Sequence, residues 1–267
     1  MAKKKKSKTP AFDKYDLYRK AVQSAETDVE FIRDTYKELK KKSARDLRED
    51  FCGTFALSTE WIKLNPQNTA LGVDLDPEPM EYGRENYLTK LKPDQQQRMK
   101  LIEGNVLESH VGKSDIVLAM NFSYFLFKTR DLLRAYFKNV YEGLDKDGIL
   151  IADCFGGKQC QAPIEDVGKR KGFTYYWDQD SFDPITNEAQ FYIHFRVGGF
   201  KVERVFSYDW RMWTIPELRE IMTEAGFKKT NVYWEGTAKD GSGNGVFSRT
   251  EVGESCDSWI AYIVAEK

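Results

Sequence analysis

The chain has 267 residues, of which 41% are hydrophobic and 31% are charged, and its formal net charge is −1. This balance is typical of a soluble globular protein and excludes a disordered one, and the length suits one large α/β domain or two small ones. Because the net charge is close to zero, no overall field would draw the chain to nucleic acid or to an anionic membrane.

Positive charge is concentrated at the N-terminus, where residues 1–10 contain five lysines. We expect this segment to be a disordered basic tail, and attraction to RNA or lipid is the alternative. No apolar core follows the tail, as a secretory leader would require, and no run approaches the roughly 20 apolar residues of a membrane span. With four separated cysteines and only His110 and His194, the sequence predicts a cytoplasmic protein with reduced thiols and no metal site.

Strands alternate with helices through the first part of the chain. The expected helices are 26–42, 55–66, 77–92 and 130–144. The expected strands are 44–50, 69–76, 99–105, 114–121 and 148–155. This alternation is typical of a parallel sheet that is covered by helices on both faces.

The pattern changes after the fifth strand. From about 157 to 212 the alternation is strand-like, with Gly198 and Gly199 at a plausible hairpin turn, which predicts a small antiparallel β insertion. A helix follows, and then two final strands at 230–236 and 258–266, joined by a turn-rich segment without a helix. These two strands can pair antiparallel, so we expect an α/β fold with a Rossmann-like, seven-stranded, mostly parallel sheet whose last strand is reversed.

Polar residues follow four successive strands of the expected sheet. They are Glu49 and Asp50 with the Cys52-Gly53-Thr54 turn, then Asp74, Asn105 and Asn121. In open α/β sheets, ligands bind beyond the carboxyl ends of the strands, where the strand order reverses. The sequence therefore predicts a ligand site at this edge.

The residues at this edge carry a resemblance to a known family. The segments LREDFCGTFALS, ALGVDLDPEPM, LIEGNVLES, DIVLAMNFSYF and DGILIADCF resemble the motif series of class I S-adenosylmethionine-dependent methyltransferases, over about residues 44–155. The reversed last strand also fits that family. The resemblance implies an enzyme that uses S-adenosyl-L-methionine, leaves S-adenosyl-L-homocysteine, and belongs to the branch acting on small molecules.

The resemblance also implies a role for each cofactor residue. Glu49 matches the acidic end of the family's first strand, and Gly53, between Cys52 and Thr54, matches the central glycine of its first loop. Asp74, followed by Leu75, matches the acidic residue that binds the ribose hydroxyls. Asn105, with Val106 behind it, matches the position at the adenine edge, and Asn121 matches the position near the reacting methyl.

Two features depart from the family pattern. The first loop has Phe51 and Phe55 where glycines are usual, so it must follow a different path or place its rings against the cofactor. The first strand is also unusually charged for the centre of a buried sheet, since Leu47 is its one large apolar residue.

The expected insertion and the strand after the last helix repeat a pairing of Tyr or Trp with an acidic residue. The substrate candidates are Trp177, Asp178, Tyr208, Trp210, Arg211 and Trp234. Aromatic faces and carboxylates together favour a cationic or amine-bearing acceptor. Alternatively, the tryptophans belong to the core, and Arg211 either binds an acceptor carboxylate or pairs with Asp209. Base stacking on RNA normally accompanies a basic groove, which these acidic stretches do not provide.

We expect the chain to divide into the tail at 1–10, an N-terminal helical lid or cap at 11–43, and a methyltransferase domain at 44–267. Tyr15 and Tyr18 are the lid candidates, unless this helix simply packs on the sheet edge. No histidine is suitably placed to act as a base, which favours an acceptor that is already nucleophilic or is oriented by Asn121 or Tyr124.

Three rival functions remain at the sequence level. An RNA or protein methyltransferase would use the lysine tail as a docking arm. A nicotinamide-dependent oxidoreductase would need the glycine-rich GxGxxG loop, which the chain lacks. A non-catalytic module would bind S-adenosylmethionine without turnover. We favour a small-molecule substrate, and neither nucleic acid nor a membrane as partner.

Overall fold

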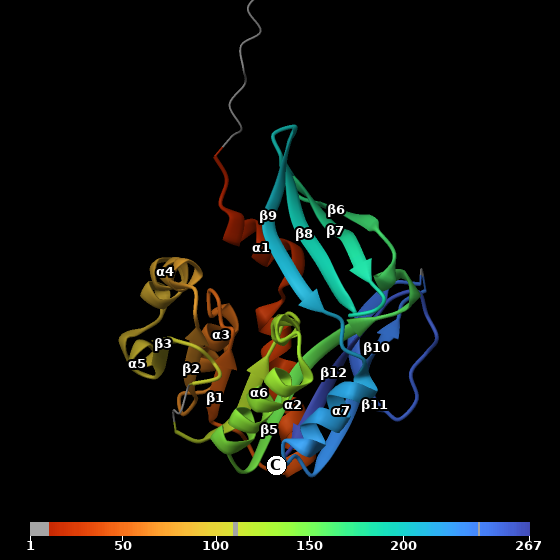
Figure 1. Cartoon of the computed structure of the whole chain (residues 1–267). Coiled ribbons are helices and arrows are strands. Elements are labelled where there is room, and N and C mark those ends of the chain that lie inside the picture. The colour runs from red at the N-terminus through yellow and green to blue at the C-terminus, as the bar shows by residue number, and fades with distance from the viewer. Residues whose placement is uncertain (1–10, 109–111, 240) are drawn as a thin grey trace, which may run out of the picture.

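The computed structural model describes residues 11–108, 112–239 and 241–267, so the predicted tail at 1–10 and His110 lie outside the described residues. Its larger sheet contains eight strands (Figure 1). Their order is β11 (Gly243–Thr250), β10 (Lys229–Thr237), β12 (Trp259–Glu266), β5 (Leu144–Gly156), β4 (Ser114–Ala119), β1 (Asp46–Asp50), β2 (Thr69–Asp74) and β3 (Met99–Glu103).

The strand directions confirm the predicted fold class. The pairs β1–β2, β2–β3, β1–β4 and β4–β5 are parallel, whereas β12 runs antiparallel to both β5 and β10. One strand was not predicted: β11 forms within and beyond the segment that we expected to be a turn, and it adds an antiparallel edge next to β10.

Helices cover both faces of this sheet. On one face, α2 (Ala25–Lys40) and α3 (Ala56–Leu64) contribute Val29, Ile32 and Trp61 to a core with Leu47 of β1. On the other face, α6 (Arg130–Gly143) and α7 (Ile215–Glu224) pack against β4 and β5. The remaining helices are α1 (Lys14–Val22), α4 (Pro77–Asn86), η1 (Leu88–Lys90), α5 (Pro93–Gln97), η2 (Ser123–Leu126) and η3 (Lys158–Gln161). None of the helices in the described ranges is long and apolar enough to span a membrane.

The predicted insertion after β5 is a four-stranded antiparallel sheet. It consists of β6 (Ile164–Arg170), β7 (Phe173–Asp183), β8 (Glu188–Val197) and β9 (Phe200–Arg211). Gly198 and Gly199 form the hairpin turn between β8 and β9 with φ of 55° and 86°, a conformation that glycine adopts without steric cost. Figure 1 shows this sheet beyond one end of the main sheet, with α1 beside it.

The N-terminal segment divides its contacts between the two sheets. Whereas α2 packs on the main sheet, α1 places Leu17 and Tyr18 against a small core of the antiparallel sheet. The other side of α1 reaches α4, since the Tyr82 hydroxyl donates to Asp13 over 2.8 Å. The helix α1 therefore connects the antiparallel sheet with the element that follows β2, a position suited to the predicted lid.

The charged central strand β1 is explained by a buried ion pair. Arg48 and Asp50, both at most 1% exposed, are joined from Nε to Oδ1 over 2.6 Å. The Tyr136 hydroxyl of α6 also donates to Asp50, over 2.9 Å. Burial raises the pKa of Asp50, and the neighbouring Arg48 and Tyr136 oppose this effect. The pair lets ionisable residues occupy the middle of the sheet without an unpaired charge.

Breaking this pair on one side should destabilise the protein strongly. We expect Arg48→Met to lower the free energy of unfolding by about 3–5 kcal/mol, because it leaves the Asp50 carboxylate buried without a cation. Urea denaturation at neutral pH measures this loss. The double variant Arg48→Met/Asp50→Leu should recover much of it, and Arg45→Met, at an exposed arginine, serves as control. A single variant as stable as the double variant would contradict this account.

Candidate functional site

The loop between β1 and α3 takes an unusual path. Phe51, Gly53 and Phe55 all have left-handed backbone conformations, with φ of 56°, 50° and 48°. The Phe51 ring packs near Phe127 and Tyr136 on the α6 face, while Phe55 is fully buried in the core on the α3 face. The two rings therefore pack on opposite faces of the sheet. They fix the loop on both faces of the sheet, and their burial offsets the strain of two non-glycine residues at positive φ.

Gly53 lies at the open side of this loop. A Cβ added to Gly53 would meet nothing within 4 Å, so its Cα faces free space. Its N–H donates to Asp74 Oδ2 over 2.7 Å, and Asp74 Oδ1 accepts from the Asp76 N–H over 2.9 Å. Burial raises the pKa of Asp74, and these N–H groups oppose that rise. On its other side the loop touches α4, where a Cβ on Gly83 would collide with the Thr54 carbonyl oxygen.

Glu49 lies beneath the same loop. Its carboxylate is 7% exposed, and Oε2 accepts from the backbone N–H of Ser58 over 2.9 Å and from the Ser58 hydroxyl over 2.5 Å. Burial raises the pKa of Glu49 to about 7, and the charges of Asp74 and Asp50 add to the rise. Glu49 and Asp74 are thus close enough to influence each other.

The end of β3 completes this rim. The Gly104 N–H donates to the Asp74 carbonyl oxygen over 2.8 Å, which holds Asn105 beside the end of β2. Val106 is buried behind Asn105, and Leu75, an apolar side chain, is 69% exposed at the same edge. The structure therefore brings together four predicted residues from three strand ends: Glu49, Gly53, Asp74 and Asn105.

A cavity of about 950 Å³ lies beside this rim, between the ends of β4 and β5, the antiparallel sheet and β10 to β12. Of the predicted residues, those that line it are Tyr18, Asn121, Trp177, Tyr208, Trp210 and Trp234. Glu49, Gly53, Asp74 and Asn105 are not among the lining residues. Because β4 pairs with β1, Asn121 at the end of β4 connects the rim to the cavity.

Aromatic rings form much of the cavity wall. The Tyr208 ring lies 4.5 Å from Trp210 and 6.0 Å from Trp177, measured between centroids. Burial raises the pKa of Tyr18 to about 12, and a hydrogen bond with Tyr208 opposes this rise, so α1 contacts the antiparallel sheet at the cavity. Trp234 stands on another wall, 5.0 Å from Trp259.

Carboxylates supply most of the charge. The acidic lining residues are Asp28, Asp153, Glu165, Asp166, Glu235 and Glu254. No lysine, arginine or histidine in the described parts of the chain lines this cavity. The cavity is therefore acidic and aromatic, which favours cationic ligands and disfavours anions.

Asp153 is a site residue that the sequence analysis did not identify. It is 6% exposed, and its two oxygens accept from the backbone N–H groups of Asn121 over 2.7 Å and Phe122 over 2.8 Å. These two residues are left-handed, each with φ of 57°, so Asp153 stabilises the turn that presents Asn121. Burial raises the pKa of Asp153 to about 7. The available signal was its position as the single ionisable residue in the apolar run at 148–155.

Two predicted residues turn inward. The Cys52 thiol is buried toward β2, where a Cβ on Gly72 would lie 2.9 Å from its sulfur, and burial raises its pKa. It faces the core and not the rim. Tyr124 is fully buried, and its hydroxyl donates to the Asp153 carbonyl oxygen over 2.7 Å. The prediction that Tyr124 orients the acceptor is therefore wrong, because apolar packing draws its ring beneath the site.

Arg211 also lies away from the cavity. Its guanidinium is 3.8 Å from the Trp213 ring centroid, donates to the Lys128 carbonyl oxygen over 3.1 Å and approaches Glu217 at 3.5 Å. These contacts hold Arg211 at the junction of β9 and α7, outside the residues that line the cavity, so the structure gives no support to the predicted contact with an acceptor. The alternative pairing with Asp209 is also absent from the described contacts, because Asp209 pairs with Lys128.

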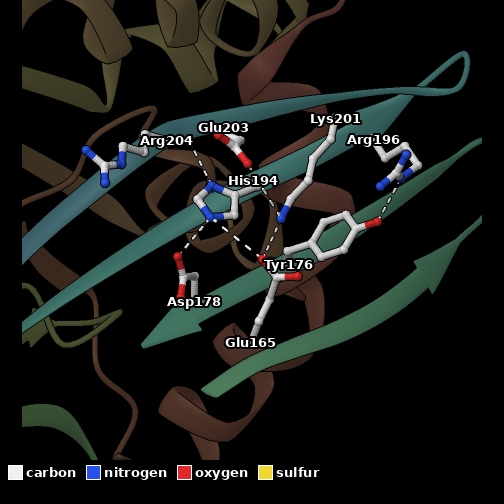
Figure 2. Close-up of polar contacts among 8 residues, drawn as sticks. All are labelled: Glu165, Tyr176, Asp178, His194, Arg196, Lys201, Glu203 and Arg204. Atoms are coloured by element: carbon white, nitrogen blue, oxygen red, sulfur yellow. Dashed lines mark hydrogen bonds and ion pairs between the residues drawn. The ribbon is translucent and has the colours of Figure 1, made fainter. Parts of the chain in front are cut away.

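Asp178 belongs to a polar cluster that includes Glu165, His194 and Lys201 (Figure 2). The His194 Nε2 lies 3.0 Å from Asp178 Oδ2, and Nδ1 accepts from the Arg204 N–H over 2.7 Å. Since Nδ1 accepts, a neutral ring carries its proton on Nε2 and donates it to Asp178, which leaves no nitrogen lone pair for a metal ion.

This cluster has a structural role. Arg204 has φ of 55° where the pairing of β8 and β9 shifts register, and His194 satisfies its N–H at this bulge. Asp178 holds the His194 ring, while its neighbour Trp177 lines the cavity. Asp178 is not among the residues that line the cavity, so the structure gives no support to its predicted role in substrate binding.

Comparison with known proteins identifies the fold. No protein-family model matches the chain, and no curated protein matches it in sequence. Among solved structures, an S-adenosylmethionine-dependent methyltransferase from Clostridium acetobutylicum is 18% identical with a TM-score of 0.69, covering 93% of this chain and 96% of that one. An amino pentose methyltransferase from Micromonospora echinaspora, with S-adenosylmethionine bound, is 16% identical with a TM-score of 0.67, covering 97% and 99%.

A third structure is the sugar N-methyltransferase from Streptoalloteichus, 17% identical with a TM-score of 0.64, covering 100% of this chain and 98% of that one. The chain therefore has the class I S-adenosylmethionine-dependent methyltransferase fold, and the fold that the motif resemblance implied is confirmed.

The buried Glu49 should make stability depend on pH. Burial raises its pKa from 4.5 to about 7, so the folded protein keeps this proton to a higher pH than the unfolded chain. The contribution of this proton to the free energy of unfolding is fully present below pH 4.5 and is lost as the pH rises through about 7. Gln cannot ionise, and its amide oxygen can still accept from Ser58. As the pH rises from below 4.5 to well above 7, the natural chain should therefore lose about 3 kcal/mol of unfolding free energy relative to Glu49→Gln.

Urea denaturation at a series of pH values measures this difference. Glu81→Gln, at an exposed glutamate, is the matched control and should follow the natural chain throughout. Parallel pH profiles for Glu49→Gln and the natural chain would show that burial does not raise the Glu49 pKa.

Proposed function

We propose that the chain is an S-adenosylmethionine-dependent methyltransferase whose acceptor is a small molecule carrying an amine or another cationic group. The observation that carries this proposal is the acidic, aromatic cavity that begins at Asn121 and has no basic residue among its described lining. Two of the similar structures are an amino pentose methyltransferase and a sugar N-methyltransferase, which supports an amine acceptor.

The rim residues fit the proposed cofactor. The Asp74 carboxylate can accept both hydrogen bonds of a ribose diol, because its oxygens have acceptor capacity beyond the two N–H groups they already bind. Open space at Gly53 allows close approach of a ligand to the backbone. Leu75 offers exposed apolar surface next to Asn105, whose side chain can bind the adenine edge. Glu49 supports the loop from beneath.

Bound S-adenosylmethionine would supply an electrophilic methyl carbon, and the protein's part is then to align the acceptor and exclude water. Asn121 is presented to the cavity by its backbone bond to Asp153, and its uncharged amide can accept from an amine without adding a negative charge beside it. We propose that α1 acts as a lid, because Tyr18 lines the cavity and the helix also contacts α4 through Asp13.

The acidic cavity disfavours the first rival, because RNA would bring phosphates against its carboxylates. The loop at Gly53 disfavours a nicotinamide-dependent oxidoreductase, because phenylalanines flank Gly53 where such enzymes have the glycines that approach the pyrophosphate. An assay of methyl transfer distinguishes the enzyme from a non-catalytic module. With labelled S-adenosylmethionine, we expect at least one amine of a broad panel to become methylated, whereas a non-catalytic module would methylate none.

Calorimetry with S-adenosylhomocysteine tests the cofactor proposal directly. We expect the natural chain to bind it, and Asp74→Asn to weaken the affinity about 10- to 100-fold because one charged acceptor is lost at the diol. Glu85→Gln, at an exposed glutamate of α4, is the matched control and should bind normally. No detectable binding by the natural chain would remove the basis of the assignment.

Removing residues 1–9 distinguishes a small-molecule acceptor from RNA. We expect the truncated protein to keep its catalytic efficiency with an amine acceptor, because the tail would have no contact with such a substrate. An RNA enzyme should instead lose salt-dependent RNA affinity with the tail. RNA binding titrated at several salt concentrations, before and after truncation, provides the measurement.

A further inference from the structure

Most cavity carboxylates have no cationic partner. Glu165 pairs with Lys201 over 2.5 Å, whereas none of the other five forms a salt bridge with a described residue. Asp153 is the most buried of them, and Asp28 and Glu235 are partly buried. Placing several carboxylates in a confined space without cations is unfavourable, so the cavity is suited to receive positive charge from a ligand.

Three of these carboxylates lie on elements that pack next to one tyrosine, and the Glu235 carboxylate also accepts from the Gly245 N–H over 2.9 Å. Tyr262 of β12 lies opposite Asp153 of β5 in the antiparallel pairing. On its other side, Tyr262 pairs with Tyr233, two residues before Glu235 on β10. Phe31 of α2 stacks on the Tyr262 ring with 4.5 Å between the ring centroids, and Asp28 lies one helical turn before Phe31.

The surroundings of the Tyr262 side chain are a second indication of a ligand site. It is only 7% exposed and lines the cavity, yet its hydroxyl makes no hydrogen bond with any residue in the described ranges. The pKa of Tyr262 is raised well above its ordinary value, first by burial and then by the charges of Asp28, Asp153 and Glu235. A largely buried side chain whose hydroxyl faces the cavity without a partner among the described residues, together with the nearby carboxylates and aromatic rings, provides acceptors for an ammonium group, which has three N–H donors.

A nitrogen held at this position would not be the one that reacts. Neighbouring carboxylates stabilise the protonated form of an amine, and a protonated amine has no lone pair for nucleophilic attack. The reacting nitrogen needs a less acidic environment, and the uncharged Asn121 amide at the end of β4 provides one. An acceptor with two nitrogens would satisfy both conditions, because one nitrogen can stay protonated among the carboxylates while the other stays neutral beside Asn121.

We propose that the acceptor is a diamine or polyamine, with one ammonium bound by Asp28, Asp153, Glu235 and Tyr262 and a second, neutral nitrogen beside Asn121. This inference rests on the proposed methyltransferase function. The neutral nitrogen forms the N–C bond with its lone pair, leaves the electron pair of the broken C–S bond on sulfur, and afterwards releases a proton to solvent. Acceptors that carry phosphate would be rejected by the same carboxylates.

Matched acceptors test the inference on the natural chain. With S-adenosylmethionine present, kcat/KM is measured for α,ω-diaminoalkanes of several lengths, for n-alkylamines and for amino alcohols of equal length. We expect the best diamine to exceed its matched monoamine and amino alcohol by about tenfold or more, because only the diamine places a second cation among the carboxylates. Equal efficiency across the three series would overturn the inference.

Asp28→Asn tests the site itself. It should lower the diamine-to-monoamine ratio of kcat/KM about 10- to 100-fold, and it should weaken diamine binding to the S-adenosylhomocysteine complex by calorimetry. Glu30→Gln, an exposed glutamate on the same helix, is the control and should change neither quantity. An unchanged ratio and unchanged diamine affinity in Asp28→Asn would overturn the assignment of Asp28.

The two levels of the proposal fail in different ways. If S-adenosylhomocysteine does not bind, or if no amine is methylated, the proposed function itself fails. If amines are methylated but a second ammonium gives no advantage, the function stands and the diamine inference is overturned.

Discussion

The site depends on the hydrogen bond between the Gly53 N–H and the Asp74 carboxylate, which joins the ends of two neighbouring strands. The loop after β1 that makes this bond follows a left-handed path, with the partly buried Phe51 ring packed on one face of the sheet and the buried Phe55 ring on the other. Families that use glycines in this loop gain backbone freedom at the expense of unfolded-state entropy. Here side-chain burial stabilises the same kind of turn, and the single remaining glycine faces open space.

Asp153 connects this rim with the cavity. Its side chain stabilises the left-handed turn at Asn121 and Phe122, and its strand position places it opposite Tyr262 on β12. The same residue therefore shapes the end of β4, where the rim begins, and contributes negative charge to the proposed ammonium site. A carboxylate can serve in both ways because each oxygen can accept more than one hydrogen bond.

Much of the fold was predictable because β-strand and helix periodicities differ, and the reversal of β12 followed from the absence of a helix before it. The Gly- and Ser-containing segment before β11 concealed the eighth strand, since its pairing depends on β10 and not on local preference. The pairing of an aromatic residue with an acidic neighbour did not predict which acids reach the cavity: Trp234 and Glu235 both line it, whereas Trp177 lines it and Asp178 does not. Asp28 joins the cavity only through packing of α2, which no local pattern signals.

The raised pKa values of two cavity acids bear directly on the proposed ammonium site. Burial raises the pKa of Asp153 to about 7 and that of Asp28 to about 6, so both carboxyl groups keep their protons to a higher pH than an exposed aspartate does. An entering ammonium favours their ionised forms and displaces those protons. In the proposed reaction, methyl transfer would move positive charge from sulfur to the nitrogen beside Asn121, while the carboxylates would hold the other, protonated nitrogen of the acceptor.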